Sequence, residues 1–515
     1  MGLSQHKLLK GTVILSVTGF ITRIIGFIYK IYLADLLGAH MLGLYQLVFP
    51  VYAICFTIYG AGLQTAISQV IAAQISKNKK AAHPERILAA GTLAGLVLAV
   101  TISLFVYFQA DWIAVHFVME PTLAPYLRIL CFLFPFCSVS ACINGYYYGV
   151  QEAKVPAFTQ MVEQIVRVAF VFLLCTLLSS GLTPKQSCAY AVWGLVAGEI
   201  ASNIYNVYHV SPLFSHKMPQ KKRCRKDSSL AGVGKTLLWL TLTLTVTRLF
   251  VSLLNSIESF LLPAMLRSYG LSASEALSIY GVLTGMSLSF IFFPSTITHS
   301  FSVMLLPSIA EAYAAKDTNR IRHSVTISIK YCVLIGLLCT CLFLIFGREL
   351  GMIVFHNEDA GNYLTVLSWL CPFLYLSTTL TSVINGMEKT QVTFFFTVLS
   401  LGTKIAILVL AVPVFGIRAY LIGLLVSQLL LVFLECWYLR EYIRLDALHI
   451  VIFPSLALAG MGWLAKESYA FLQSSFVGWY RMLPLAAVAG IVCLWFAAVL
   501  YLTGIVSPKD WRKMT

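Results

Sequence analysis

Residues 11–33 read GTVILSVTGFITRIIGFIYKIYL, an apolar run that is interrupted by two cations, Arg23 and Lys30. The run is long enough to span a bilayer, which needs about 20 apolar residues, yet charged side chains are costly in hydrocarbon. Ser16, Arg23 and Lys30 follow one another at intervals of seven residues, so a helix places them on one stripe. We therefore predict that the stripe lines a wet, cationic cavity that accepts an anionic cargo. Lys30 has an alternative role, because it lies near the helix end and can extend its ammonium group to the interface.

The composition of the whole chain is that of a polytopic membrane protein. Of its 515 residues, 59% are hydrophobic and 11% are charged, and the mean hydropathy is +0.83. Soluble globular domains do not have this composition. The thirteen cysteines are scattered without ligand-spaced partners, which predicts neither a metal site nor a bound cofactor.

Apolar runs of spanning length predict an all-α fold with about fourteen transmembrane helices. The predicted helices are 11–33, 42–70, 87–109, 125–149, 157–179, 187–209, 236–262, 276–306, 325–346, 363–386, 392–413, 416–438, 448–466 and 482–504. Their connections are short, and the sequence contains no G-x-S-x-G, H-E-x-x-H or P-loop motif. We therefore expect no catalytic residues and no enzymatic activity.

Lysine and arginine gather in the even-numbered connections and in both tails, whereas the odd-numbered connections are acidic or mixed. The positive-inside rule then places both termini in the cytoplasm. The most basic connection, HKMPQKKRCRKD at 216–227, accounts for much of the net charge of +15. Charge alone is compatible with nucleic acid, but the position of this run beside membrane helices favours anionic membrane lipids as its partner.

Two parts of the sequence repeat. LCFLFPFCSVSACING at 130–145 parallels LCPFLYLSTTLTSVING at 370–386, and Thr22-Arg23 parallels Thr247-Arg248. The repeat predicts two pseudo-symmetric six-helix lobes around a central cavity, with two further C-terminal helices. The predicted boundaries are 1–210 for the N-terminal lobe, 211–235 for a basic cytoplasmic linker, 236–440 for the C-terminal lobe, and 441–515 for helices thirteen and fourteen with the tail.

The repeat also extends the set of candidate substrate-binding residues. Aligning the two arginines brings Ser16, Arg23 and Lys30 onto Thr241, Arg248 and Asn255. Arg167 and Lys404 also match each other, as cavity-lining residues or as helix-end cations that reach the interface. Glu258 is a candidate partner for the cations, or a structural carboxylate near the outer interface. Weaker candidates for ion coupling are Glu163, Glu199 and Glu435, with His299 as a candidate proton relay.

Prolines inside predicted helices mark candidate bending points. A proline removes one hydrogen bond of the helix, and glycine relaxes the backbone. The hinge candidates are Pro50, Pro294 and Pro307, with Gly60 and Gly62 near the first. A static kink that improves packing is the alternative interpretation.

Several segments resemble one known family. They are KGTVILSVTGFITRIIGFIYKIYLADLLG, GLYQLVFP, AISQVIA, TRLFVSLLNSIESFLLPAMLRSYGLS and FFPSTITHSFSVMLLPSIAEA. Together they are similar to stage V sporulation protein B and its relatives, in the polysaccharide-transporter branch of the MOP flippase superfamily. That superfamily also includes the lipid II flippases and, more distantly, the MATE drug antiporters. The resemblance covers most of residues 10–440 and implies a two-lobed, fourteen-helix flippase fold.

The resemblance also implies a role for one residue. Arg23 matches the first-helix arginine that lipid II flippases place in their cavity. The second such arginine falls at Tyr29 here, beside Lys30, and the second-helix arginine falls near Ala53. Headgroup recognition is therefore expected to be rearranged relative to the lipid II flippases.

These observations predict a flippase of the bacterial plasma membrane. It would export a lipid II-like, undecaprenyl-pyrophosphate-linked cell-wall or polysaccharide precursor by alternating access, driven by membrane potential, Na⁺ or H⁺. Arg23 and Arg248 would hold the pyrophosphate, with help from Lys30 and Glu258, and two lobes in one chain permit a working monomer. One alternative is a cation-coupled multidrug antiporter of the same superfamily. Another is a membrane enzyme such as a polyprenyl-linked sugar transferase, although its acidic or histidine-rich loops are not visible.

Overall fold

A computed structural model describes residues 2–77, 84–178, 181–215, 230–443, 448–473 and 481–506. The described residues form helices joined by short turns, and none of them lies in a strand. The predicted all-α class is confirmed. Contacts divide the chain into two compact units, unit 1 over Met1–Ala264 and unit 2 over Met265–Thr515, with the boundary inside one long helix, α9.

Unit 1 contains α1 to α8 and most of α9. The bounds are α1 Gly2–Phe56, η1 Thr57–Ala61, α2 Gly62–Lys77, α3 Pro84–Phe108, α4 Ala110–Trp112, η2 Ile113–Phe117, η3 Pro121–Leu123, α5 Ala124–Leu130, η4 Cys131–Leu133, α6 Phe134–Gly149, α7 Lys154–Leu177, α8 Pro184–Ser215 and α9 Leu230–Ser268. Buried apolar side chains of α2, α3 and α6, among them Ile67, Ile87 and Ile143, form a core cluster of this unit.

Unit 2 contains the remaining helices. The bounds are α10 Ala273–Gly281, η5 Val282–Ser287, α11 Leu288–Phe292, α12 Ser295–Ala314, α13 Thr318–Phe355, α14 Glu358–Leu367, η6 Ser368–Leu370, α15 Cys371–Gly386, α16 Thr390–Phe415, α17 Ile417–Tyr438, η7 Leu448–Ile452, α18 Phe453–Gln473 and α19 Met482–Leu502. Side-chain caps explain several starts, because Asp317 accepts a hydrogen bond from the Arg320 amide and Asn357 from the Ala360 amide.

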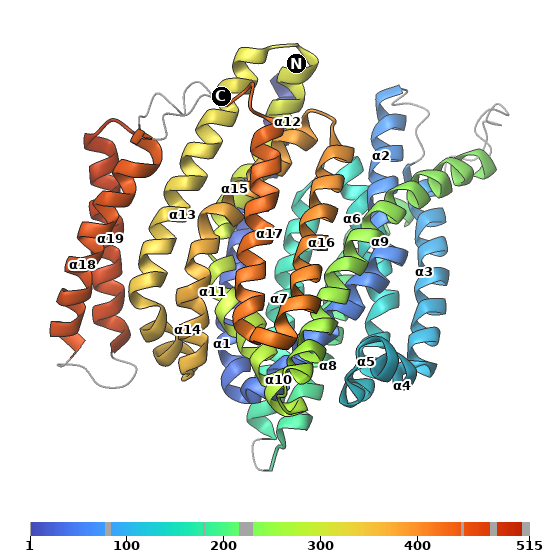
Figure 1. Cartoon of the computed structure of the whole chain (residues 1–515). Coiled ribbons are helices and arrows are strands. Elements are labelled where there is room, and N and C mark those ends of the chain that lie inside the picture. Colours follow the sequence, from blue (N-terminus) through green and yellow to red (C-terminus); the bar gives the residue numbers. More distant parts are fainter. Residues whose placement is uncertain are drawn as a thin grey trace. The chain divides into compact units, whose positions relative to one another are not determined.

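The two units repeat the same helix pairings. In unit 1, α6 packs against α2, α3 and α8, and α7 packs against α8. In unit 2, α15 packs against α12, α13 and α17, and α16 packs against α17, beside which it runs in Figure 1. The sequence repeat of 130–145 and 370–386 thus falls on the central helix of each unit, α6 and α15.

The last two helices form an addition to unit 2. In Figure 1, α18 and α19 stand side by side next to α13. Their apolar faces, with Leu458, Tyr469, Val492 and Phe496 buried, form one cluster with Phe346 of α13. The predicted helices 448–466 and 482–504 thus correspond to α18 and α19, a pair of helices that does not belong to the repeat.

Twelve helices among the described residues are long and apolar enough to cross a membrane, so the chain is a multi-pass membrane protein. The predicted number of about fourteen is not confirmed by this measure. One of the twelve, Val17–Ile75, is 59 residues long and covers two predicted helices, 11–33 and 42–70. The predicted helix 187–209 lies in α8, which is not among the twelve and carries Glu199, Asn203 and Asn206.

The break between the first two predicted helices lies within the predicted connection, residues 34–41, but it is a kink at a single residue. Helix α1 continues through residues 34–41, and its only non-helical backbone is at Gly38, with φ 68° and ψ 171°. Glycine is favoured at this φ, because the Cβ of any other residue would strain the backbone. The chain therefore turns at one glycine instead of through a loop.

The three predicted bending points differ in structure. Pro50 lies inside α1 and Pro307 inside α12, where the helices continue through them. Pro294 precedes α12 and follows a turn that ends α11 at Phe292, so the predicted helix 276–306 is interrupted there. A role of these prolines as hinges stays a prediction.

Candidate functional site

Helix α1 presents its cationic stripe along a border between buried and exposed residues. On one flank Tyr29 and Leu33 are buried, whereas on the other Ile28 is 60% exposed. Arg23 itself is exposed and Lys30 is half-buried. Of the three stripe residues, only the side chain of Ser16 lies outside the described part of the structure. An arginine that is exposed within a membrane-spanning segment needs water or an anion beside it.

The buried flank of α1 faces α7 and α8. A Cβ added at Gly26 would lie 3.5 Å from Gln164 Nε2 of α7, an ordinary van der Waals distance, so the Gln164 side chain packs over this glycine. Gly26 therefore lies at the contact between α1 and α7.

Arg248 of α9 contacts the junction of η1 and α2. Its Nη1 donates to the Ala61 carbonyl at 2.7 Å and to Thr65 Oγ1 at 2.9 Å. Thr65 Oγ1 also donates to the Ala61 carbonyl at 3.1 Å. The guanidinium is thus held by a backbone carbonyl and a hydroxyl within unit 1, and its side chain remains exposed.

Glycine at position 62 permits this approach of α9. A Cβ at Gly62 would lie 2.0 Å from Thr245 Oγ1 and 3.1 Å from the Thr241 carbonyl. Further along, Ser256 Oγ donates to the Pro50 carbonyl at 3.1 Å. Contacts from Thr241 to Ser256 therefore fasten α9 along the end of α1, η1 and the start of α2.

The other two candidates on α9 differ from each other. Asn255 is exposed and donates from Nδ2 to the Val251 carbonyl of its own helix, at 2.9 Å. Glu258 is only 7% exposed. Ten residues separate Glu258 from Arg248, which gives them azimuths about 80° apart, so they lie on different faces of α9.

Arg167 of α7 lies in a polar cluster with α8. It forms an ion pair with Glu163, one turn earlier on the same helix, and both side chains are largely buried. Glu199 of α8 is buried within electrostatic range of both groups. Two carboxylates and one guanidinium thus share this part of the bilayer-spanning bundle.

Amide and hydroxyl groups complete the cluster and were not predicted from the sequence. Asn203 Nδ2 donates to the Phe136 carbonyl at 2.8 Å and to Ser140 Oγ at 2.9 Å, and its distance to Glu199 Oε1 is 3.5 Å. Thr159 Oγ1 donates to Asn206 Oδ1 at 2.6 Å. The available signal was the recurrence of Asn and Ser within apolar runs, since such residues need partners inside a membrane.

Unit 2 contains only one of the seven predicted binding residues, Lys404 of α16, which is half-buried. The weaker candidate Glu435 of α17 is 0% exposed. Its Oε1 accepts a hydrogen bond from Thr381 Oγ1 at 2.5 Å, and its Oε2 has no hydrogen-bond partner among the described residues. His299 is exposed on α12.

Six of the predicted residues belong to unit 1, on α1, α7 and α9: Arg23, Lys30, Arg167, Arg248, Asn255 and Glu258. No group of three or more His, Cys, Asp or Glu side chains that could hold a metal occurs in the described ranges. Guanidinium and ammonium groups inside a membrane-spanning bundle are suited to phosphate oxygens, because charge-assisted hydrogen bonds are strong at low dielectric. Recognition of an anion by the cations of this set stays a prediction.

Comparisons with known proteins agree with the fold and with the sequence motifs. Residues 8–311 match the polysaccharide biosynthesis protein family, and residues 248–410 match the MatE family. Stage V sporulation protein B of Bacillus subtilis (strain 168) is 26% identical over 389 residues, which cover 75% of this chain and 74% of that protein. Lipid II flippase MurJ of the same organism is 22% identical over 456 residues, which cover 79% and 77%.

Among solved structures, lipid II flippase MurJ in an inward closed conformation superimposes with a TM-score of 0.71 at 13% identity, over 96% of this chain and 100% of that one. An inward-facing multidrug resistance MATE family transporter gives a TM-score of 0.64 at 15% identity, over 84% and 98%. At these identities the likeness concerns the fold. The family match covers more than half of the sequence, and the chain accordingly belongs to the polysaccharide biosynthesis protein family.

Proposed function

We propose that the protein is a flippase that moves an undecaprenyl-pyrophosphate-linked sugar, a precursor of cell wall or polysaccharide, across the bacterial plasma membrane. The observation that carries the proposal is the pair of exposed arginines, Arg23 and Arg248, which the sequence repeat aligns and which lie in two membrane-spanning helices. An arginine exposed at that depth is costly unless it meets water or an anion. A pyrophosphate supplies two adjacent sets of anionic oxygens that a guanidinium binds bidentately.

The hydrogen bonds of Arg248 suit a binding step in which the guanidinium leaves its protein acceptors for the cargo. Its present acceptors, the Ala61 carbonyl and Thr65 Oγ1, are neutral. Hydrogen bonds to a charged acceptor are stronger than those to neutral ones, so a pyrophosphate would compete for the guanidinium. In this proposal, Lys30 and Glu258 assist the two arginines, Asn255 contributes an amide, and Arg167 and Lys404 are accessory positions.

The names of the relatives support the same class of cargo. One relative is a lipid II flippase, and the matched family is named for polysaccharide biosynthesis. Translocation needs no chemical step, so we propose no enzymatic activity, with the two halves of the chain alternating access and both termini in the cytoplasm. We infer that membrane potential, Na⁺ or H⁺ drives transport by one working chain.

Reconstituted transport tests the proposal. Proteoliposomes carry a fluorescent undecaprenyl-pyrophosphate-linked disaccharide-peptide, and an impermeant quencher outside reports its exposure. We expect faster exposure with the protein than in empty liposomes or with a protein-free detergent control. Equal rates, with the protein inserted and folded, would reject this cargo.

Residues 248–410 match the MatE family, so one competing function is a cation-coupled multidrug antiporter. Export of organic cations calls for acidic groups in the binding site, whereas Arg23, Lys30 and Arg248 are basic. Accumulation of a cationic dye in cells with and without the protein separates the two functions. Lower dye content with the protein would favour the antiporter.

A further inference from the structure

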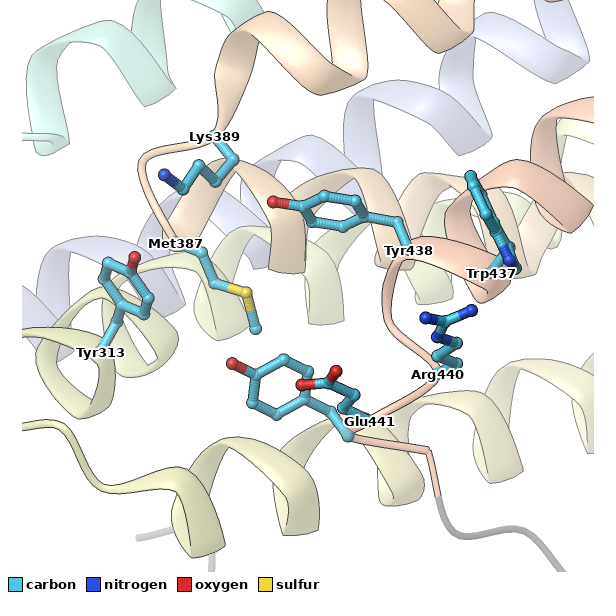
Figure 2. Close-up of a pocket in the computed structure, with 8 residues that line it drawn as sticks. Tyr313, Met387, Lys389, Trp437, Tyr438, Arg440 and Glu441 are labelled. Carbon is cyan, nitrogen blue, oxygen red and sulfur yellow. The ribbon is translucent and has the colours of Figure 1, made fainter.

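A cavity of about 310 Å³ lies in unit 2, where α12, α15 and α17 end and α16 begins. Figure 2 shows it as an opening surrounded by side chains from the ends of α12 and α17, from the loop between α15 and α16, and from the residues that follow α17. Its lining consists of Tyr313, Met387, Lys389, Trp437, Tyr438, Arg440, Glu441 and Tyr442. We call it the α15–α17 pocket.

The α15–α17 pocket lies at a boundary between membrane and water. The membrane-spanning segment Ile417–Tyr438 ends at its rim, where Trp437 is 57% exposed. Tryptophan and tyrosine concentrate at the headgroup level of a bilayer, and arginine and lysine follow on its cytoplasmic side. The connections that form the pocket are among those whose Lys and Arg content predicts a cytoplasmic position. A ligand of this pocket is therefore expected at the level of inner-leaflet headgroups.

Both signs of charge face this one cavity. Lys389 and Arg440 lie on opposite sides of the opening in Figure 2, and Glu441 lies at its lower edge. None of these three side chains forms an ion pair within the described part of the chain, although all line the same cavity. Because these side chains do not neutralise one another in ion pairs, they can bind a ligand that carries both a positive and a negative charge.

The aromatic lining adds a second recognition element. Arg440 Cζ lies 5.8 Å from the centroid of the Trp437 ring, which fixes the guanidinium beside the rim. Tyr313, Tyr438 and Tyr442 surround the rest of the cavity. Aromatic rings together with a carboxylate bind ammonium groups, whereas lysine and arginine bind phosphate.

The rim is held by backbone contacts. Glu388, between Met387 and Lys389, adopts a left-handed φ of 61°, which is uncommon for a non-glycine residue. The Lys389 amide donates to the Ile384 carbonyl at 3.2 Å, and Arg322 Nη2 lies 3.5 Å from the Glu441 carbonyl. The two charged loops are thus anchored to α15 and α13.

We propose that the α15–α17 pocket binds the headgroup of phosphatidylethanolamine from the inner leaflet. The phosphate of the headgroup lies between Lys389 and Arg440. The primary ammonium group donates hydrogen bonds to Glu441 and makes cation–π contacts with the tyrosine rings. A purely anionic headgroup would place negative charge against Glu441. The volume is at the small end of the range for ligand pockets, about 300–1,000 Å³, which suits a headgroup whose acyl chains stay in the bilayer. The site is independent of the transported cargo.

Native mass spectrometry of the purified, delipidated full-length protein tests this site. The protein is titrated with phosphatidylethanolamine, phosphatidylglycerol or phosphatidylcholine, and with soluble phosphoethanolamine as a competitor. We expect one saturable phosphatidylethanolamine site, whose affinity falls about tenfold in Glu441→Gln and in Lys389→Gln, as for loss of one charged contact. The matched control Glu388→Gln removes a neighbouring charge that does not line the pocket and should leave affinity unchanged.

Charge reversal makes the test sharper. Glu441→Lys should exchange the preference, so that phosphatidylglycerol binds in place of phosphatidylethanolamine. Three results would overturn the proposal: tighter binding of phosphatidylglycerol to the parent, an equal loss in Glu388→Gln, or soluble phosphoethanolamine binding as tightly as the lipid. All variants change exposed side chains, and an unchanged elution profile confirms that they fold.

Discussion

Unit 1 and unit 2 pair their helices alike but differ in the polar groups between those helices. The repeat aligns Ser140 of α6 with Thr381 of α15. In unit 1 the Ser140 hydroxyl meets the amide of Asn203, whereas in unit 2 the Thr381 hydroxyl meets the carboxylate of Glu435. The repeated feature is therefore a buried hydroxyl with a polar partner, and the chemistry of the partner is free to vary.

The cations differ in the same way. Arg167 and Lys404 are aligned, but the residue one turn earlier is Glu163 in unit 1 and Ser400 in unit 2. Ser400 is buried and donates to the Ser427 carbonyl at 2.7 Å. Helix packing is thus retained in both units, while the ion pair of α7 has a hydroxyl group in its place on α16. The comparison teaches that helix pairing does not determine where the binding chemistry lies.

The largest expected effect on stability is at Arg167. Arg167→Gln strands the largely buried Glu163, and losing one partner of a buried pair costs about 3 kcal/mol. Lys404→Gln has Ser400 and no acid one turn earlier, so it removes no ion pair of that spacing and should cost less than Arg167→Gln. Free energies of unfolding of the purified variants in micelles give both values. The double variant with Glu163→Gln should recover part of the loss, and equal losses for Arg167→Gln and Lys404→Gln would contradict the difference between the units.

The next largest effect on stability is expected at Gly62, where the absence of a side chain allows α9 to pack closely. Gly62→Ala forces a Cβ against Thr245 and the Thr241 carbonyl, and overpacking of this kind costs about 2 kcal/mol. Gly19→Ala is the matched control on α1, because its Cβ would have no neighbour within 4 Å. Thermal unfolding should show a lower midpoint for Gly62→Ala only. If Gly62→Ala were as stable as Gly19→Ala, α9 would not be fastened at this point.

Asn203 should have a smaller effect. Asn203→Ala removes the donor to the Phe136 carbonyl and to Ser140, and unsatisfied buried acceptors cost about 1–2 kcal/mol. Chemical unfolding monitored by circular dichroism measures the loss. An unchanged unfolding midpoint would mean that water replaces the amide and that the cluster is open to solvent.

Glu435 should have the smallest effect. Glu435→Gln keeps an oxygen to accept from Thr381 and replaces a carboxylate oxygen that has no partner among the described residues. We expect stability within about 1 kcal/mol of the parent, because no hydrogen bond is lost. The same unfolding experiment tests this. A large loss would show that the carboxylate binds a group that a neutral amide cannot hold.

The sequence predicted the helical class, the repeat and the added pair α18–α19, because long apolar runs and the Asn-Gly segments are local signals. It also placed the break between the first two helices in residues 34–41, where the structure has a kink at Gly38, but it did not predict that one residue alone interrupts the helix. The cluster around Asn203 was also missed, because its members come from α6, α7 and α8. The hydrogen bond from Arg248 to the Ala61 carbonyl could not be predicted either, because a backbone acceptor leaves no pattern in a sequence.

Transport by the arginine variants tests the central claim most directly. Proteoliposomes with Arg23→Ala, Arg248→Ala or Lys404→Ala are compared with the parent for exposure of the pyrophosphate-linked sugar, after insertion and folding are verified. We expect Arg23→Ala and Arg248→Ala each to slow translocation at least about tenfold, since each loses a charge-assisted contact to the pyrophosphate, and Lys404→Ala to slow it less. Parental rates in both arginine variants would contradict the assignment of cargo recognition to the charged residues of unit 1.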